Sequence, residues 1–295
     1  MSTTGIANET KWKRTALLSE GTLTEQSALQ ATLTIEITEF RFRFYCESNG
    51  NCIWLEDYAS DMHLTDTEVH ENLKLLFFNH PVLSLTNWKA IHVMIGFGAF
   101  TLIPTEVFRK EYASRYLQLT QGHAPLSSRK VLSQHIASWD CYNVFEMPLI
   151  WWDFFRDQFA LRDLTFSHVT SVLTGNPPLP LESREPLIHL CVQERHFVAT
   201  IFESGRLIFC NRFHYQHPEE ATFFYLSCLN ELGLLAQAVK LVFSGEITPF
   251  SKFYGELSKF TRDISFARKP GHLKYPAAFD DLADHRYFTL LNANK

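Results

Sequence analysis

The chain contains 295 residues, of which 46 % are hydrophobic and 20 % charged, so a sizeable core can form and a disordered or low-complexity architecture is excluded. Its formal charge of −5 lacks the basic excess typical of nucleic-acid-binding proteins, and no nucleic-acid partner is expected. Glycine is scarce, with only 12 residues, which matters because loops that wrap phosphates need backbone without Cβ atoms.

The N-terminal stretch Met1–Gly21 has basic residues but no following apolar segment, so we expect no signal peptide. The longest nearly uncharged stretch, Ala90–Pro104, is too short to span a bilayer and reads as a buried strand with its exit loop. The six cysteines form no CxxC motif and are predicted to be reduced and structural. Together these features predict a cytoplasmic protein without a transmembrane segment.

Residue patterns predict the first elements in chain order after a loose N-terminal tail over residues 1–27. Period-two alternation predicts strands, Asn49-Gly50 predicts a hairpin turn, and a 3.6-residue period predicts helices. The predicted elements are strands 33–37, 40–44 and 52–58, helix 66–78, strand 90–95 and helix 104–117, the last opened by Pro104. In the second strand, Phe40, Phe42 and Phe44 are expected in the core, with Arg41 and Arg43 on a wetter face.

An intermediate segment follows. The residues 121–129 are predicted to form a polar connection, followed by strand 142–146, helix 149–159 and strand 165–169. The sequence Gly175-Asn176-Pro177-Pro178 then breaks the chain.

The second half repeats the plan of the first. Its predicted elements are strands 187–192, 196–202 and 207–213, helix 218–232, strand 239–243, helix 248–260, strand 263–266 and a helix near 279–292. The order βββαβα occurs twice, with a hairpin turn in the same place, at Ser204-Gly205 in the second half. We therefore predict a first half over residues 28–178 and a second half over residues 179–295.

Two βββαβαβα halves in one chain resemble the duplicated ribonuclease-H-like architecture of the actin-like ATPase superfamily. The stretch Asn211–Tyr225, followed by Leu241–Ile247, also resembles an uncharacterised bacterial family, the domain-of-unknown-function family numbered 3822. The similarity extends from about Ala31 to Asn292. It implies an α/β protein with an actin-like ATPase fold and mixed sheets, and it brings no established reaction.

The superfamily resemblance implies phosphate loops at the first hairpin turn of each half. The first such stretch, residues 35–40, has Glu36 and Thr38 but no glycine, and Glu39 would repel a phosphate. The second, residues 190–196, has no glycine and no well-placed Asp. We predict at most a vestigial nucleotide cleft, with ATP and Mg²⁺ disfavoured and no catalytic residue, formed by Glu36, Thr38, Glu194, Arg195, Ser244, Gly245 and Glu246.

Other chemistries find less support. No GxxxxGK(S/T) motif occurs, and no GxSxG motif occurs. The closest histidine pair, His214-x-x-His217, lies in a predicted strand-to-helix loop without a cysteine ligand, so no metal site is expected.

Two functions therefore stay open. The first is a non-catalytic actin-like scaffold that binds an unidentified protein partner, with a homodimer left open. The alternative is a divergent nucleotide-binding ATPase or kinase-like enzyme that uses Glu36, Glu194, Arg195 and Glu246 in the same cleft. The missing phosphate-loop glycines favour the first.

Overall fold

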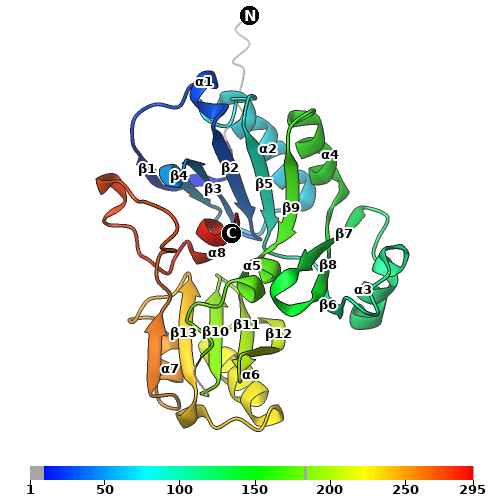
Figure 1. Cartoon of the computed structure of the whole chain (residues 1–295), viewed down its shortest axis with the longest axis vertical. Coiled ribbons are helices and arrows are strands. Elements are labelled where there is room, and N and C mark those ends of the chain that lie inside the picture. Colours follow the sequence, from blue (N-terminus) through cyan, green and yellow to red (C-terminus); the bar gives the residue numbers. More distant parts are fainter. Residues whose placement is uncertain (1–9, 183–184, 295) are drawn as a thin grey trace, which may run out of the picture.

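The computed structural model describes residues 10–182 and 185–294 and contains two large sheets, one above the other in Figure 1. The first sheet has the order β1-β4-β3-β2-β5-β9. Its strands are β1 (Lys13–Ser19), β2 (Ala31–Ile37), β3 (Arg41–Ser48), β4 (Asn51–Ala59), β5 (Ala90–Ile95) and β9 (Leu164–His168). The second sheet has the order β12-β11-β10-β13-β14, with β10 (Leu187–Val192), β11 (His196–Glu203), β12 (Arg206–His214), β13 (Lys240–Gly245) and β14 (Asp263–Phe266).

A small third sheet, β6-β8-β7, lies beside the first two (Figure 1). It is formed by β6 (Phe100–Pro104), β7 (Arg129–Ile136) and β8 (Cys141–Pro148). The helices are α1 (Glu25–Ala28), α2 (Asp66–Asn79), α3 (Ala113–Gln121), α4 (Leu149–Gln158), α5 (Val169–Gly175), α6 (Pro218–Glu231), α7 (Lys252–Leu257) and α8 (Phe288–Asn292). None of the helices in the described part of the chain is long and apolar enough to cross a membrane.

The predicted duplication of the strand order is confirmed. The series β4-β3-β2-β5-β9 in the first sheet corresponds to β12-β11-β10-β13-β14 in the second. In both, the hairpin pairs are antiparallel and the later strands add in parallel. The mixed sheets therefore arise from the same topology used twice.

Local chemistry explains the elements that the sequence predicted well. Asn49-Gly50 and Ser204-Gly205 both have positive φ angles, of 51° and 75° in each pair, which is the geometry of tight hairpin turns. Helix α2 begins after Thr65, whose side chain accepts from the Glu68 amide while Glu68 reaches back to the Thr65 amide. All six cysteines are free and five of them are buried, as expected for structural thiols.

The N-terminal tail prediction is wrong for the described residues that follow residue 9. Residues 13–19 form β1, which pairs antiparallel with β4, and residues 25–28 form α1. The side chains of β1 are mostly exposed because it is an edge strand, so apolar periodicity gave no signal. The prediction for residues 1–9 lies outside the described residues.

Two further predictions fail around irregular segments, and one strand was missed. The helix predicted over 104–117 is wrong, because Pro104 ends β6, which pairs with β8, and the helix begins only at Ala113. The predicted polar connection ends where β7, which the sequence patterns did not indicate, begins at Arg129. The helix expected near 279–292 is limited to α8, because residues 267–287 run mainly as loop and turn.

The C-terminal segment returns to the first sheet. The residues Leu273, Phe279 and Leu290 form one apolar cluster with Tyr45 and Leu55 of β3 and β4. Helix α8 thus packs on the first sheet near its junction with the second, as Figure 1 shows in red. The boundaries proposed for the two halves stay a prediction.

Candidate functional site between the two sheets

Two hairpin turns, one from each sheet, contact each other directly. The turn after β2 carries Glu39 and Phe40, and the turn after β10 carries Glu194 and Arg195. The Arg195 guanidinium carbon lies 5.3 Å from the centre of the Phe40 ring. Nε of Arg41, at the start of β3, forms an ion pair with Glu194. The turns that the superfamily resemblance assigns to the two phosphate loops are therefore bound to one another.

Arg43 is at the centre of a buried ion-pair network next to these turns. Its side chain is fully buried, and its Nε donates to Asp57 Oδ1 at 3.2 Å. Its Nη2 pairs with Glu246, which directly follows β13 of the second sheet. Arg43 thus joins the two sheets through one guanidinium group.

Arg41 makes a second set of links between the sheets. Its Nη1 donates to both carboxylate oxygens of Asp57, at 3.1 and 3.0 Å. Its Nη2 lies 3.0 Å from Glu246 Oε2. Because the planar guanidinium presents several donors in a fixed geometry, Arg41 can bind Asp57, Glu194 and Glu246 at once.

The C-terminal segment completes the network. Arg286 donates from Nε to Glu246 Oε1 at 3.1 Å and from Nη2 to Asp57 Oδ2 at 3.3 Å. The Tyr287 hydroxyl also donates to Asp57 Oδ2, at 3.1 Å. Asp57 therefore accepts from three guanidinium groups and a phenol, so both of its carboxylate oxygens already bind donors of the protein.

The charges of the network follow from this pairing. Burial alone would raise the pKa of Asp57, but Arg43, Arg41 and Arg286 hold it below its usual range. Burial disfavours the charged form of Arg43, yet its carboxylate partners raise its pKa well above the ordinary value. Asp57 and Arg43 are consequently ionised together in the folded protein.

The pKa of Glu36 is shifted in the opposite direction to that of Asp57. It is fully buried on β2, accepts from the Thr289 hydroxyl at 2.9 Å, and lies 3.9 Å from Arg43 Nη1. Burial raises its pKa above the usual value, although Arg43 and Thr289 oppose the shift. The Glu36 carboxyl therefore loses its proton less readily than an exposed glutamate does.

The structure brings three of the predicted site residues, Glu36, Glu194 and Glu246, together around Arg41 and Arg43. Arg195, also predicted, contacts Phe40 of the opposite turn, and the remaining predicted residues have roles within their own half. The hydroxyl of Thr38 accepts from the Arg41 amide at 3.1 Å, and Ser244 bonds the buried His189 at 2.8 Å.

Gly245 is required by a close approach of two strand ends. It has a φ of +84°, and a Cβ atom built on it would lie 2.1 Å from the carbonyl oxygen of Val192. The glycine therefore allows β10 and β13 to run in contact to their ends, which places Glu246 against the arginines.

The prediction of a wetter face for Arg41 and Arg43 is wrong. The Arg43 side chain is fully buried and that of Arg41 is 11 % exposed, because the second sheet and the C-terminal segment cover this face. The expected core positions of Phe40, Phe42 and Phe44 are confirmed. Asp57 and Arg286 were missed, and only the alternation of arginine with phenylalanine in β3 gave a signal for this face.

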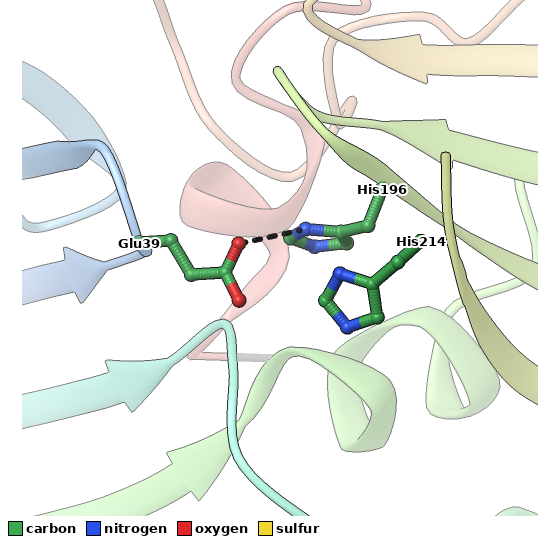
Figure 2. Close-up of side chains that lie close together, drawn as sticks. All are labelled: Glu39, His196 and His214. Atoms are coloured by element: carbon green, nitrogen blue, oxygen red, sulfur yellow. Dashed lines mark ion pairs between the residues drawn. The ribbon is translucent and has the colours of Figure 1, made fainter. Parts of the chain in front are cut away.

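A second polar group lies beside the same two turns. Glu39, His196 and His214 point toward one another in Figure 2, with candidate ligand atoms all within 4.8 Å. These residue types can hold a metal ion. The closest pair in the sequence, His214 and His217, was not expected to bind a metal, and the group in the structure contains His196 in place of His217.

A cavity of about 970 Å³ opens elsewhere, between the third sheet and the second. Its walls include β6 on one side and Arg206–Asn211 of β12 on the other. Both strands are sheet edges, and no backbone hydrogen bond joins them in the described part of the chain. Unpaired edges of this kind offer main-chain donors and acceptors to another chain.

Comparisons with solved structures agree on the fold. A protein of unknown function from Bacteroides thetaiotaomicron VPI-5482, described as having an actin-like ATPase fold, superposes with a TM-score of 0.73 and 21 % identity, over 83 % of this chain and 94 % of that one. The PilM–PilN type IV pilus biogenesis complex has a chain with a TM-score of 0.62 and 9 % identity, over 89 % of this chain and 97 % of that one. No curated protein sequence matches.

The remaining comparison is with protein families. The model of one family, described as protein of unknown function (DUF3822), matches residues 20–264. This range includes both hairpin turns and the first-sheet and second-sheet residues of the ion-pair network, although Arg286 lies beyond it. The protein is therefore a member of the DUF3822 family and has the actin-like ATPase fold.

Proposed function

We propose that this protein is a non-catalytic scaffold that acts by binding another protein. The observation that carries the proposal is the network in which Arg41, Arg43 and Arg286 bind Asp57 and Glu246 between the two sheets. In this reading, the region that phosphates occupy in an actin-like ATPase is filled by the protein's own ion pairs.

The cost of opening this network supports the proposal. A nucleotide phosphate would have to displace Glu194 and Glu246 from the arginines and then lie beside those two carboxylates. Removing one partner from a buried ion pair costs about 3 to 5 kcal/mol, because the other charge stays buried. Asp57, with its oxygens already bound to donors, is also poorly placed to orient a hydrated Mg²⁺.

The cavity between β6 and β12 is the place we propose for a partner. An extended peptide segment could pair with the edge of either strand while its side chains enter the cavity. The similarity to PilM, whose solved structure is a complex with PilN, supports a protein partner without identifying it.

The absence of nucleotide binding is tested by thermal unfolding of the full chain with and without millimolar Mg-ATP. A ligand at 100 times its Kd stabilises a protein by about 2.7 kcal/mol, which would raise the Tm by several degrees. We expect no shift, and no phosphate release above the buffer rate in a parallel hydrolysis assay.

The enzyme alternative predicts the opposite result. A Tm increase of several degrees with Mg-ATP, or phosphate release that Glu36→Gln abolishes, would overturn the scaffold proposal. Equal background rates for the wild type and Glu36→Gln would remove the enzyme alternative.

The partner site is tested by placing a photo-crosslinking amino acid at Ile208, which lines the cavity. A matched control places it at Phe250, which is highly exposed and lies outside the cavity. We expect a discrete crosslinked protein in cells only from position 208. The same product from both positions, or none from position 208, would contradict this site.

A further inference from the structure

Two histidines of the second sheet stand directly opposite each other. His196 is the first residue of β11 and His214 the last of β12, and they are partners in the antiparallel register. Their ring centres are 5.5 Å apart. The His196 side chain is nearly fully buried, whereas His214 is exposed, so solvent reaches the pair from one side.

A carboxylate from the first sheet approaches the same pair. Glu39 extends from the turn after β2, and its Oε2 lies 3.6 Å from Nδ1 of His196 (Figure 2). That separation is too long for a hydrogen bond, and the buried Nδ1 atom has no other hydrogen-bond partner. A buried nitrogen without a partner, aimed at a carboxylate, is an unexplained cost in a folded protein.

We propose that Glu39, His196 and His214 bind one divalent transition-metal ion, with Zn²⁺ as the preferred ion. Zinc binds imidazole nitrogen and carboxylate oxygen at about 2.0 to 2.2 Å, so two ligand atoms of a tetrahedral site lie about 3.4 Å apart. The observed 3.6 Å between Glu39 and His196 is close to this separation, and all candidate atoms lie within 4.8 Å of one another. Water takes the fourth position.

Metal binding sets the protonation state that each ligand must have. A carboxylate coordinates when ionised and an imidazole when neutral, so the site requires the carboxylate form of Glu39 and neutral rings at His196 and His214.

The donor set decides which class of metal fits. The neighbouring Arg212 guanidinium donates to the Gly98 carbonyl at 2.8 Å and offers no ligand atom. A site with one carboxylate and two imidazoles is a poor match for Mg²⁺ or Ca²⁺, which bind through oxygen ligands. Imidazole ligands instead favour Zn²⁺ and neighbouring transition metals.

The bound ion would join the two sheets. Glu39 belongs to the first sheet and both histidines to the second, so the metal adds a link beside the Arg41–Glu194 ion pair. This inference goes beyond the scaffold proposal and is independent of it, since neither nucleotide nor partner binding enters it.

The experiment is isothermal titration of the metal-stripped full chain with Zn²⁺, and with Mg²⁺ for comparison. We expect one Zn²⁺ per chain, a Tm that rises with Zn²⁺ concentration, and no binding of Mg²⁺. Co²⁺ in place of Zn²⁺ should give the absorption of a site without thiolate ligands, which distinguishes this site from adventitious binding by the free cysteines.

His214→Ala is the decisive variant because His214 is exposed, so its removal should leave the fold intact. Losing a ligand should weaken Zn²⁺ binding at least tenfold, since even outer-shell changes cost about 10- to 100-fold. The matched control is His217→Ala, three residues away and without a side-chain cap on α6. Glu39→Gln should also weaken binding. No Zn²⁺ binding by the wild type, or equal affinity in His214→Ala and His217→Ala, would overturn the proposal.

Discussion

The space between the two sheets and the interior of each sheet bury polar groups in different ways. Between the sheets, arginines and carboxylates are buried as charged pairs around Arg43. Inside the sheets, burial lowers the pKa of His92 to about 4 and that of His189 to about 3, which favours the neutral rings. His92 bonds Thr165 and Ser167, both at 2.7 Å, and His189 bonds Ser244. Between the sheets, partners from both halves together offset the desolvation of the buried charges.

The largest effect is expected from removing the shared cation. Arg43→Ala removes the fully buried guanidinium that Asp57 and Glu246 share and leaves these carboxylates to Arg41 and Arg286. We expect the free energy of unfolding to fall by about 3 to 5 kcal/mol. Urea denaturation measures the change. Arg14→Ala is the control, because its pair with Glu56 involves a side chain that is 51 % exposed and should cost no more than about 1 kcal/mol. Equal losses in the two variants would contradict a structural role for the network.

A smaller loss is expected where the second sheet positions Glu246. In Gly245→Ala, the new methyl group would collide with the Val192 carbonyl at a positive φ, which should cost about 2 to 4 kcal/mol. The control Gly255→Ala lies in α7 with open space around it. It should be neutral or stabilising by up to about 1 kcal/mol, and a loss like that of Gly245→Ala would show that the close approach does not matter.

The smallest effect is the pH dependence of the free energy of unfolding that the buried His92 produces. Burial lowers the pKa of His92 to about 4 from a usual 6.5, so on acidification the unfolded state takes up a proton before the folded state does. Stability is therefore lost as the pH falls from 6.5 towards 4, by about 2 kcal/mol between pH 6.5 and 5 for this group.

The His92→Gln variant isolates that contribution. Its free energy of unfolding should fall by about 2 kcal/mol less than that of the wild type between pH 6.5 and 5. Glutamine keeps a donor and an acceptor for Thr165 and Ser167. Parallel pH profiles for the two proteins would show that His92 is not held neutral.

Much of the fold could be predicted from the sequence because strands and turns depend on residues close together in the chain. The strands at 187–192 and 263–266 coincide with β10 and β14, and the turns at Gly50 and Gly205 were found from their own chemistry. The strands β1, β6 and β7 were missed because their side chains are mostly half-buried or exposed, so apolar alternation is weak there.

The candidate site was readable only in part. The absence of phosphate-loop glycines and the presence of Glu36, Glu194 and Glu246 are visible in the chain. The partners of these glutamates could not be predicted from the sequence, because Arg43 and Glu246 are 203 residues apart and come into contact only in the folded protein. The same holds for Glu39 and His196, which no spacing rule connects.

The sequence by itself determined the order of the elements and the repeated plan, because turns and side-chain periodicity act over a few residues. Its scarcity of glycine also predicts that neither turn wraps a phosphate, which the Mg-ATP experiment tests. The surroundings of these two turns depend on the tertiary structure, because Arg41 and Arg43 of the interior strand β3 become buried only when the second sheet and the C-terminal segment cover them. Once buried, these arginines are paired with Glu194 and Glu246 of the second sheet as well as with Asp57 of the first, and those pairs exist only in the folded protein.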